Sequence, residues 1–264
     1  ALKTRDNKSV DVGQVWWFWF TTSAFDVDKR LRRIFRLLPT DPRCKFCNAP
    51  FRGIGGTLVK AVFGKQRSDL NPRICNLCEE ASRRFPGGAE VEMAILFADV
   101  RGSTSLAEKM KPVEFQQLIQ KFYSLATNLI VNEDGLVEKL AGDAVTAFWG
   151  AGFAGPDYVR RTIEVAQNLS KLMERHGIPV GIGVHSGVAY FGSVGTVDGL
   201  MDISAIGDEV NVAARLASKA ATGEIIVSEQ ALSEAGIDNS NLEARSLELK
   251  GISEPVSVRV MYGG

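Results

Sequence analysis

The 264-residue sequence lacks net charge, and it lacks any apolar run long enough to cross a bilayer. A transmembrane helix needs about 20 consecutive apolar residues, whereas the aromatic run Val15–Phe20 is short and has polar neighbours. No segment combines a basic start, an apolar stretch and a small-residue cleavage site, so no secretory signal is predicted. With 45% hydrophobic and 23% charged residues, disorder and a collagen-like chain are excluded. We therefore expect a cytoplasmic protein with one or two folded units.

The zero net charge is a cancellation between two parts of the chain. Residues 1–90 contain 17 basic and 9 acidic residues, a net charge of +8, whereas residues 91–264 contain 14 and 22, a net charge of −8. Cysteine is absent from the last 186 residues, which carry most of the apolar patterning. We predict an N-terminal accessory region, residues 1–90, followed by a second domain, residues 91–264.

The four cysteines form two Cys-x-x-Cys pairs, Cys44 with Cys47 and Cys75 with Cys78, separated by 27 residues. This spacing is typical of two tight turns whose thiolates complete a tetrahedral site, so a structural Zn²⁺ ion is the first interpretation. An iron-sulfur cluster also suits four thiolates, and a redox-sensing disulfide pair is a third possibility. Because few apolar residues lie between the pairs, a metal would stabilise a unit that lacks a full core.

Basic residues surround the cysteine pairs, and we expect them to form mainly a solvated face. They are Arg43, Lys45, Arg52, Lys60, Lys65, Arg67 and Arg73. No aromatic residues are interleaved with them at a base-reading spacing, so nucleic acid is not an expected partner. A nucleic-acid-binding zinc module is a less favoured alternative, which rests only on the +8 charge and the cysteine pairs.

Two further segments precede the cysteines. Val15–Phe20, which contains three of the four tryptophans, is interpreted as a buried strand or packing segment, with a membrane or partner anchor as the alternative. Residues 28–38 have apolar side chains at helical spacing and a basic face, and Pro39 follows. They predict an amphipathic helix. Packing against the N-terminal unit or a second copy is favoured over contact of residues 29–38 with a membrane surface.

A buried strand is predicted over residues 92–98, and a carboxylate, Asp99, follows it directly. Next come Gly102, Ser103 and Thr104 at a helix start, where free backbone N–H groups favour phosphate oxygens. Helical periodicity then extends from 112 to about 131. Taken alone the motif is weak, because serine and threonine at a helix start are usually caps.

A second carboxylate, Asp143, is predicted at the turn of a hairpin formed by residues 135–148. If the ends of the strands that carry Asp99 and Asp143 are neighbours, the two side chains can hold two divalent ions against a polyphosphate. A turn residue without further duty is the alternative for Asp143.

The third motif covers residues 201–216 and predicts a helix that begins near Asp208. Asn211 and Arg215 lie four apart and so project from one face of this helix. The alanine-rich flanks indicate a packed face, where an unpaired arginine would be costly.

Together these segments resemble the catalytic domain of the bacterial class III nucleotidyl cyclases, the adenylyl and guanylyl cyclase family, over about residues 91–262. The resemblance rests on residues 97–104, 139–143, 180–187, 205–215 and 249–256. It implies an α+β fold in which a ferredoxin-like βαββαβ core, an antiparallel sheet flanked by helices, follows the small cysteine-rich unit. It also implies a head-to-tail homodimer with its active sites at the interface.

The resemblance further implies roles for single residues. Asp99 and Asp143, with the backbone carbonyl of Val100, would hold two Mg²⁺ or Mn²⁺ ions for attack of the ribose 3′-hydroxyl on the α-phosphorus. Asn211 would position the ribose, and Arg215 would neutralise charge on the α-phosphate. In the family these two residues act on nucleotide held by the aspartates of the other protomer.

Base selection depends on Lys139 and Ser204. Lys139 matches the adenine-selecting lysine of adenylyl cyclases, whereas Ser204 stands where many of them have aspartate. A serine hydroxyl can still accept from the adenine amino group, so ATP is favoured over GTP or a pyrimidine nucleotide. Ile252 departs from relatives that bind triphosphate with a lysine there, and Lys250 or Arg101 are candidate substitutes.

The alternative to an adenylate cyclase is a catalytically inactive nucleotide-binding module that senses metal or redox state. The presence of every carried-over residue favours the enzyme. His176 and His185 receive no catalytic role, because a histidine inside an apolar strand, as at His185, is usually structural.

Overall fold

The computed structural model describes residues 11–22, 26–38, 42–196 and 199–263. The helices there are α1 (Val12–Thr21), α2 (Asp26–Leu37), α3 (Gly53–Phe63), α4 (Asn76–Arg84), α5 (Ser103–Lys109), α6 (Pro112–Asn132), α7 (Ala151–Ala154), α8 (Tyr158–Arg175), α9 (Asp208–Lys219) and α10 (Glu229–Glu234). The strands are β1 (Gly88–Val100), β2 (Leu136–Ala141), β3 (Ala144–Trp149), β4 (Val180–Gly195), β5 (Met201–Ile206), β6 (Glu224–Ser228), β7 (Glu243–Leu247) and β8 (Val256–Tyr262).

These strands form one sheet in the order β2-β3-β1-β4-β6-β8-β7, and β5 pairs with β4. The chain runs β1–α6–β2–β3–α8–β4, so the βαββαβ connectivity implied by the sequence is present. The β2–β3 hairpin has Gly142 in its turn with a φ of 63°. The pairings among the four core strands are antiparallel, as the resemblance implies, whereas β6, outside this core, runs parallel to β4. The sheet is therefore mixed.

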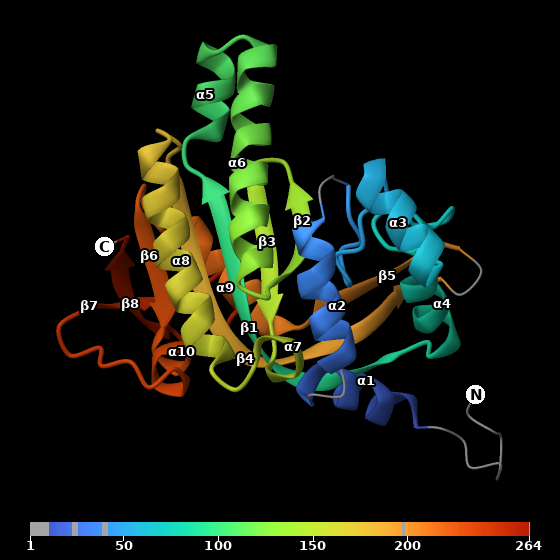
Figure 1. Cartoon of the computed structure of the whole chain (residues 1–264). Coiled ribbons are helices and arrows are strands. Elements are labelled where there is room, and N and C mark those ends of the chain that lie inside the picture. The colour runs from blue at the N-terminus through green and yellow to red at the C-terminus, as the bar shows by residue number, and fades with distance from the viewer. Residues whose placement is uncertain (1–10, 23–25, 39–41, 197–198, 264) are drawn as a thin grey trace.

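Helices cover both faces of the sheet (Figure 1). α6 and α8 lie on one face, α9 lies on the other, and the helices of the N-terminal region stand beside the β5 side of the sheet. On α6 the buried side chains are Phe122, Ala126 and Ile130, each four residues from the next. This spacing places them on one helical face. The main core thus lies between the sheet and its helices.

The aromatic segment Val15–Phe20 is a helix, so its interpretation as a strand is wrong, whereas a packing role is observed. Asp11 caps α1 by accepting from the N–H of Gly13 at 2.9 Å. Trp16 and Phe20, four residues apart, are buried in the main core. The indole of Trp16 also donates to the carbonyl of Phe85 at 2.9 Å. Trp16 and Phe20, the buried side chains of α1, lie at helical spacing, and their burial outweighs the strand propensity of aromatic residues.

Two glycines allow α1 to dock closely. A Cβ added to Gly150 would lie 2.2 Å from a ring carbon of Phe20, and one added to Gly152 would lie 2.4 Å from its carbonyl oxygen. The ring of Phe20 instead packs against Phe153 and Phe191, at centroid distances of 5.2 and 4.5 Å. The segment after β3 is thus shaped to receive this helix.

A second core surrounds the cysteines and includes Phe35 from α2. The arginines of α2 contact the end of α6: Arg33 pairs with Asp134 at 3.3 Å, and Arg36 donates to the carbonyl of Val131 at 2.7 Å. The carbonyl end of a helix carries partial negative charge, which favours such contacts. The predicted helix and its packing are therefore observed, while Pro39 lies outside the described residues.

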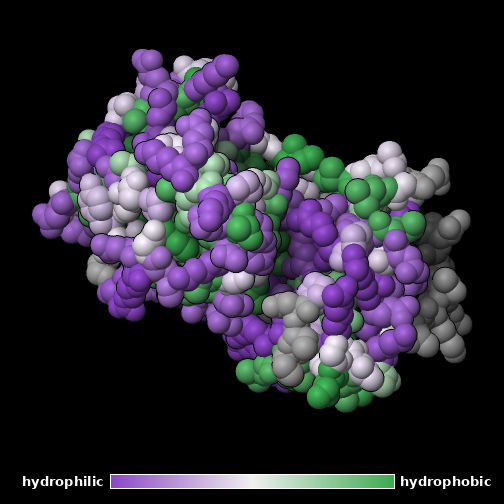
Figure 2. Space-filling model, turned by 90° about the horizontal axis from the view of Figure 1, so that it is seen from above, coloured by the Kyte–Doolittle hydropathy of each residue, from purple (hydrophilic) through white to green (hydrophobic). Residues whose placement is uncertain are grey.

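The surface differs between the two parts of the chain. Figure 2 shows hydrophobic side chains on the part that contains the N-terminal helices, next to a largely hydrophilic face. On α3, Ile54, Leu58 and Val62 are exposed. Among the described helices, none combines the length and apolarity needed to cross a membrane.

The domain boundary near residue 90 stays a prediction. The cysteines have a core of their own, but α1, which precedes them, joins the main core.

We expect Phe20→Ala to lower the free energy of unfolding by about 3–5 kcal/mol, because it empties a packed aromatic site. Phe18→Ala is the matched control on the same helix, since Phe18 is 51% exposed whereas Phe20 is 2% exposed. That variant should change stability by less than about 1 kcal/mol. Urea denaturation measures both, and equal losses would contradict the docked position of α1.

Candidate active site

The two predicted metal-binding aspartates lie at neighbouring strand ends. Asp99 pairs in register with Ala144, and the N–H of Val100 donates to the carbonyl of Asp143 at 3.0 Å. Burial raises the pKa of Asp99, the adjacent Arg101 opposes this shift, and the charge of Asp143 adds to it. Two mutually repelling carboxylates at one edge of a sheet are a donor set that fits hard divalent cations.

Both carboxylates have protein partners. Arg101 pairs with Asp99 at 2.6 Å and also donates to the carbonyl of Ser218 at the end of α9, at 3.2 Å. The hydroxyl of Ser103 donates to Asp143. Ser103, predicted to bind phosphate, thus lies beside a metal candidate, and Arg101 is held between β1 and α9.

The remaining residues of the first motif lie at the start of α5. Gly102 adopts a φ of 66°, a left-handed conformation that favours glycine, and it precedes the first residue of the helix. Gly102 and Thr104 are exposed, whereas Ser103 is half-buried. Their predicted contact with the triphosphate stays a prediction.

Asn211 and Arg215 lie on α9, which begins at Asp208 as predicted. Asn211 is exposed. Arg215 lies beside Gly251 of the terminal turn, and its buried Nε has no hydrogen-bond partner. Within the part of the chain that the structure describes, no hydrogen bond or ion pair joins Asn211 or Arg215 to either aspartate. One protomer therefore does not bring the two groups into contact.

The two base-selecting candidates lie on β2 and β5. Lys139 is exposed on β2, after an irregularity in the pairing with β3 at Glu138. The hydroxyl of Ser204 on β5 donates to Oε1 of Glu138 at 2.9 Å. The residue that precedes Lys139 thus contacts Ser204, which brings the two segments together.

Residues 89–258 match the family described as the adenylate and guanylate cyclase catalytic domain. The chain belongs to this family. It is 30% identical over 190 residues to a protein of Mycobacterium tuberculosis, covering 70% of this chain and 35% of that one. It is also 30% identical over 181 residues to an adenylate cyclase of Anabaena cylindrica, covering 63% and 36%. The chain spans about a third of the length of these curated relatives.

Two solved structures share the fold. The guanylyl cyclase Cya2 is 24% identical with a TM-score of 0.61, and the match covers 66% of this chain and 93% of that one. The adenylyl cyclase CyaB from P. aeruginosa is 25% identical with a TM-score of 0.59, and the match covers 65% and 94%. The family match shows that the chain contains a nucleotidyl cyclase catalytic domain, and the two solved structures that share its fold are named as a guanylyl and an adenylyl cyclase.

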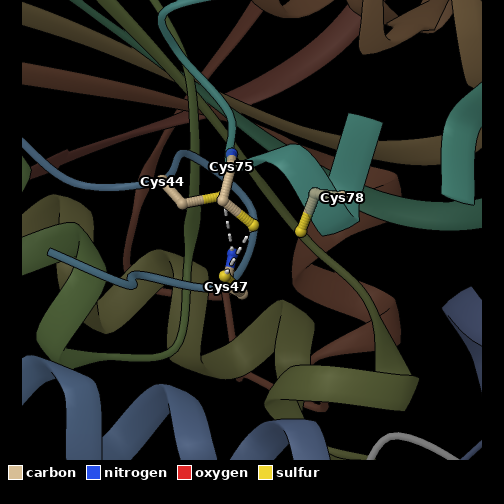
Figure 3. A group of neighbouring side chains, drawn as sticks. All are labelled: Cys44, Cys47, Cys75 and Cys78. Carbon is tan, nitrogen blue, oxygen red and sulfur yellow. Dashed lines mark hydrogen bonds between the residues drawn. The ribbon is translucent and has the colours of Figure 1, made fainter. Parts of the chain in front are cut away.

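The four cysteines of this chain converge on one point (Figure 3). All four are buried, and their Sγ atoms lie within 4.8 Å of one another. Sγ of Cys47 and Sγ of Cys75 are 3.8 Å apart, whereas a disulfide requires about 2.05 Å. Four sulfurs around one ion at the Zn–S distance of about 2.3 Å are separated by about 3.8 Å. The spacing fits a single tetrahedral ion better than a cluster, whose several irons spread their ligands apart.

The cysteines also differ in their surroundings. Burial raises the pKa of the Cys44 thiol, whereas hydrogen bonds from the other three thiols, that of Cys44 first, lower the pKa of Cys75. The N–H groups of Cys47 and Cys75 point at Sγ of Cys44, at 3.5 and 3.3 Å. Such N–H contacts stabilise negative charge on sulfur, which is the form that binds metal.

The expectation that the basic residues near the cysteines are mainly solvated is wrong for Lys45, whose side chain is 9% exposed, whereas Arg73 is exposed as expected but still forms an ion pair. Nζ of Lys45 lies 2.5 Å from Oε2 of Glu138 and 2.7 Å from the carbonyl of Ile203. Arg73 pairs with Asp202 at 3.0 Å. Sequence reasoning missed these contacts. Its one available signal was that Lys45 lies inside the first Cys-x-x-Cys turn.

The four-cysteine site predicts about one zinc ion per chain in protein purified without chelators. Cys47→Ser should lose the ion and lower the thermal unfolding midpoint, because the second core surrounds the cysteines. Asp143→Asn is the control, since it alters only the other metal candidate and should keep the zinc. Mass spectrometry of metals measures the content. Iron with labile sulfide, or no bound metal, would contradict the zinc prediction.

Proposed function

We propose that this cyclase converts ATP to 3′,5′-cyclic AMP and pyrophosphate at sites shared between two protomers. The observation that carries the proposal is the adjacency of Asp99 and Asp143 at the ends of β1 and the β2–β3 hairpin. Two Mg²⁺ or Mn²⁺ ions bound there would activate the ribose 3′-hydroxyl and hold the triphosphate. The carboxylates of Asp99 and Asp143 and the backbone carbonyl of Val100 would be the ligands of these ions.

Asn211 and Arg215 act on nucleotide bound to the partner's aspartates. Asn211 hydrogen-bonds the ribose so that its hydroxyl lies in line with the α-phosphorus, and Arg215 neutralises the charge that grows on the phosphate. The buried Nε of Arg215 without a partner supports a position prepared for an anion, because an unpaired buried donor is costly.

A homodimer would join the two half-sites. Exposed apolar side chains support an interface next to the start of α9: Val188 and Tyr190 on β4 and Ile206 on β5 are 52%, 38% and 53% exposed. Tyr190 and Ile206 pair directly in the sheet, and Ile206 is two residues before α9. A two-fold axis there would produce two equivalent sites.

ATP is the proposed substrate because Lys139 donates to adenine N1 and Ser204 can accept from the amino group. The named adenylate cyclase of Anabaena cylindrica supports the same choice. GTP is the second candidate, since the fold is shared with the guanylyl cyclase Cya2 and a lysine also donates to guanine O6.

The four-cysteine site is proposed to hold a structural Zn²⁺ ion.

The substrate is tested by incubating the protein with ATP, GTP, UTP and CTP in Mg²⁺ and in Mn²⁺. Chromatography should find cyclic AMP as the main product. Asp143→Asn should lower turnover roughly 100-fold or more, because it removes a metal ligand. Asp157→Asn, an exposed position at the start of α8, should leave it unchanged. Predominant cyclic GMP would establish the second candidate, and no product from any nucleotide would favour the inactive nucleotide-binding module.

The shared site is tested by mixing two inactive variants, Asp99→Asn and Arg215→Ala. A mixed dimer has one site with intact aspartates and an intact arginine. Random exchange of subunits should therefore restore about a quarter of the wild-type activity. Each variant alone should remain inactive, and absence of recovery in a mixture shown to exchange subunits would refute sites at the interface.

A further inference from the structure

The hydroxyl of Ser204 has only acceptors as partners among the described residues. Its Oγ donates to Oε1 of Glu138 at 2.9 Å. The carbonyl of Ala205 is a second acceptor at 3.5 Å, a longer and therefore weaker contact. A hydroxyl has one hydrogen and two lone pairs. Because the hydrogen points to Glu138, the oxygen of Ser204 can offer only lone pairs to a ligand.

Glu138 is held at both its side chain and its backbone. Its Oε2 lies 2.5 Å from Nζ of Lys45, and the two side chains are 13% and 9% exposed. Arg73 donates to the backbone carbonyl of Glu138. A carboxylate paired with an ammonium group has acceptor atoms only, so it cannot donate to Ser204.

Lys45 is itself fixed by several acceptors. Besides Glu138, its ammonium group donates to the carbonyl of Ile203 at 2.7 Å and lies 3.4 Å from Asp202. Its backbone N–H donates to the carbonyl of Arg73 at 2.8 Å. The cysteine-bearing turns therefore position Lys45 at the junction of β2 and β5.

We propose that Glu138, held by Lys45, is a specificity-determining positioning residue that makes Ser204 a hydrogen-bond acceptor and so selects adenine. The amino group of adenine donates at the position where guanine O6 accepts. An acceptor-only serine oxygen matches the first and faces the second with two lone pairs. This inference rests on the proposed function, and it assigns the base preference to a residue outside the positions carried over from the family.

Glu138→Gln tests the inference without changing the size of the side chain. Lys45 retains the amide oxygen, and the amide NH₂ then donates to Ser204, whose hydrogen becomes free for guanine O6. The ratio of kcat/KM for ATP to that for GTP should fall about 10-fold or more, mainly because GTP improves. An unchanged ratio would overturn the inference. Equal losses for both nucleotides, the sign of structural damage, would overturn it too.

Two further variants separate positioning from general stability. Lys45→Met should reduce the preference for ATP over GTP. Lys45→Arg, which keeps a cation beside Glu138, should retain the wild-type preference. Glu229→Gln is the control, because Glu229 also pairs with a partly buried cation, Arg259, at 2.7 Å but lies at the start of α10. It should leave the ratio unchanged. A ratio that shifts in Glu229→Gln as much as in Glu138→Gln would overturn the inference.

Binding of 3′-deoxy-ATP and 3′-deoxy-GTP separates this inference from the proposed function, because neither analogue can cyclise. Calorimetry should show that wild-type protein prefers the adenine analogue and that Glu138→Gln loses this preference. That result without any cyclic product would uphold the role of Glu138 while refuting the cyclase activity. Normal cyclic AMP synthesis with an unaltered binding preference in Glu138→Gln would do the reverse.

Discussion

The antiparallel pairing of β1 between β3 and β4 is the constraint on which the other features depend. One register places Asp99 opposite both Ala144 and Gly181, which brings the hairpin turn and its Asp143 to the end of β1. On β4, Gly183 lets α9 approach, since a Cβ there would lie 2.3 Å from the backbone nitrogen of Ala217. A slip of one residue would turn every side chain of β1 to the wrong face. The position of α9 therefore follows from the same pairing as that of the carboxylates.

Opposite charges in the two parts of the chain meet at a few specific pairs. Lys45 with Glu138 is one, and the arginines of α2 with Asp134 are another. Asp134 and Lys45 are largely buried, and in such surroundings a missing partner costs more than the intact pair contributes. The pairs thus fix where the N-terminal unit sits more than how strongly it binds. Their placement beside β2 links the cysteine turns to the strand that carries Lys139.

Local patterns predicted the elements well, and distant partners poorly. The hairpin around Asp143 and the start of α9 at Asp208 follow from periodicity and turn residues that lie within a few positions of one another, whereas the βαββαβ order was implied by the resemblance to the cyclase family. The contacts of Lys45 could not be predicted, because Asp202 is 157 residues away in sequence and no local pattern names such a partner. Aromatic residues favour strands, and this propensity led to the strand prediction for Val15–Phe20. In the structure, the burial of Trp16 and Phe20 on one face of a helix outweighs that propensity. The proposed meeting of Arg215 with the metal site of a second protomer cannot be read from sequence spacing or from a single protomer.

The docking of α1 depends on residues that are synthesised much later than the helix itself. Its partners on the core, Gly150, Phe153 and Phe191, leave the ribosome about 130 to 170 residues after Phe20. At a synthesis rate of about 5–20 residues per second, several seconds to about half a minute pass between the synthesis of Phe20 and that of its partners. During that interval Trp16 and Phe20 must stay on a nascent chain without their final partners. Chaperone contact with the growing polypeptide would shield these two side chains during the interval.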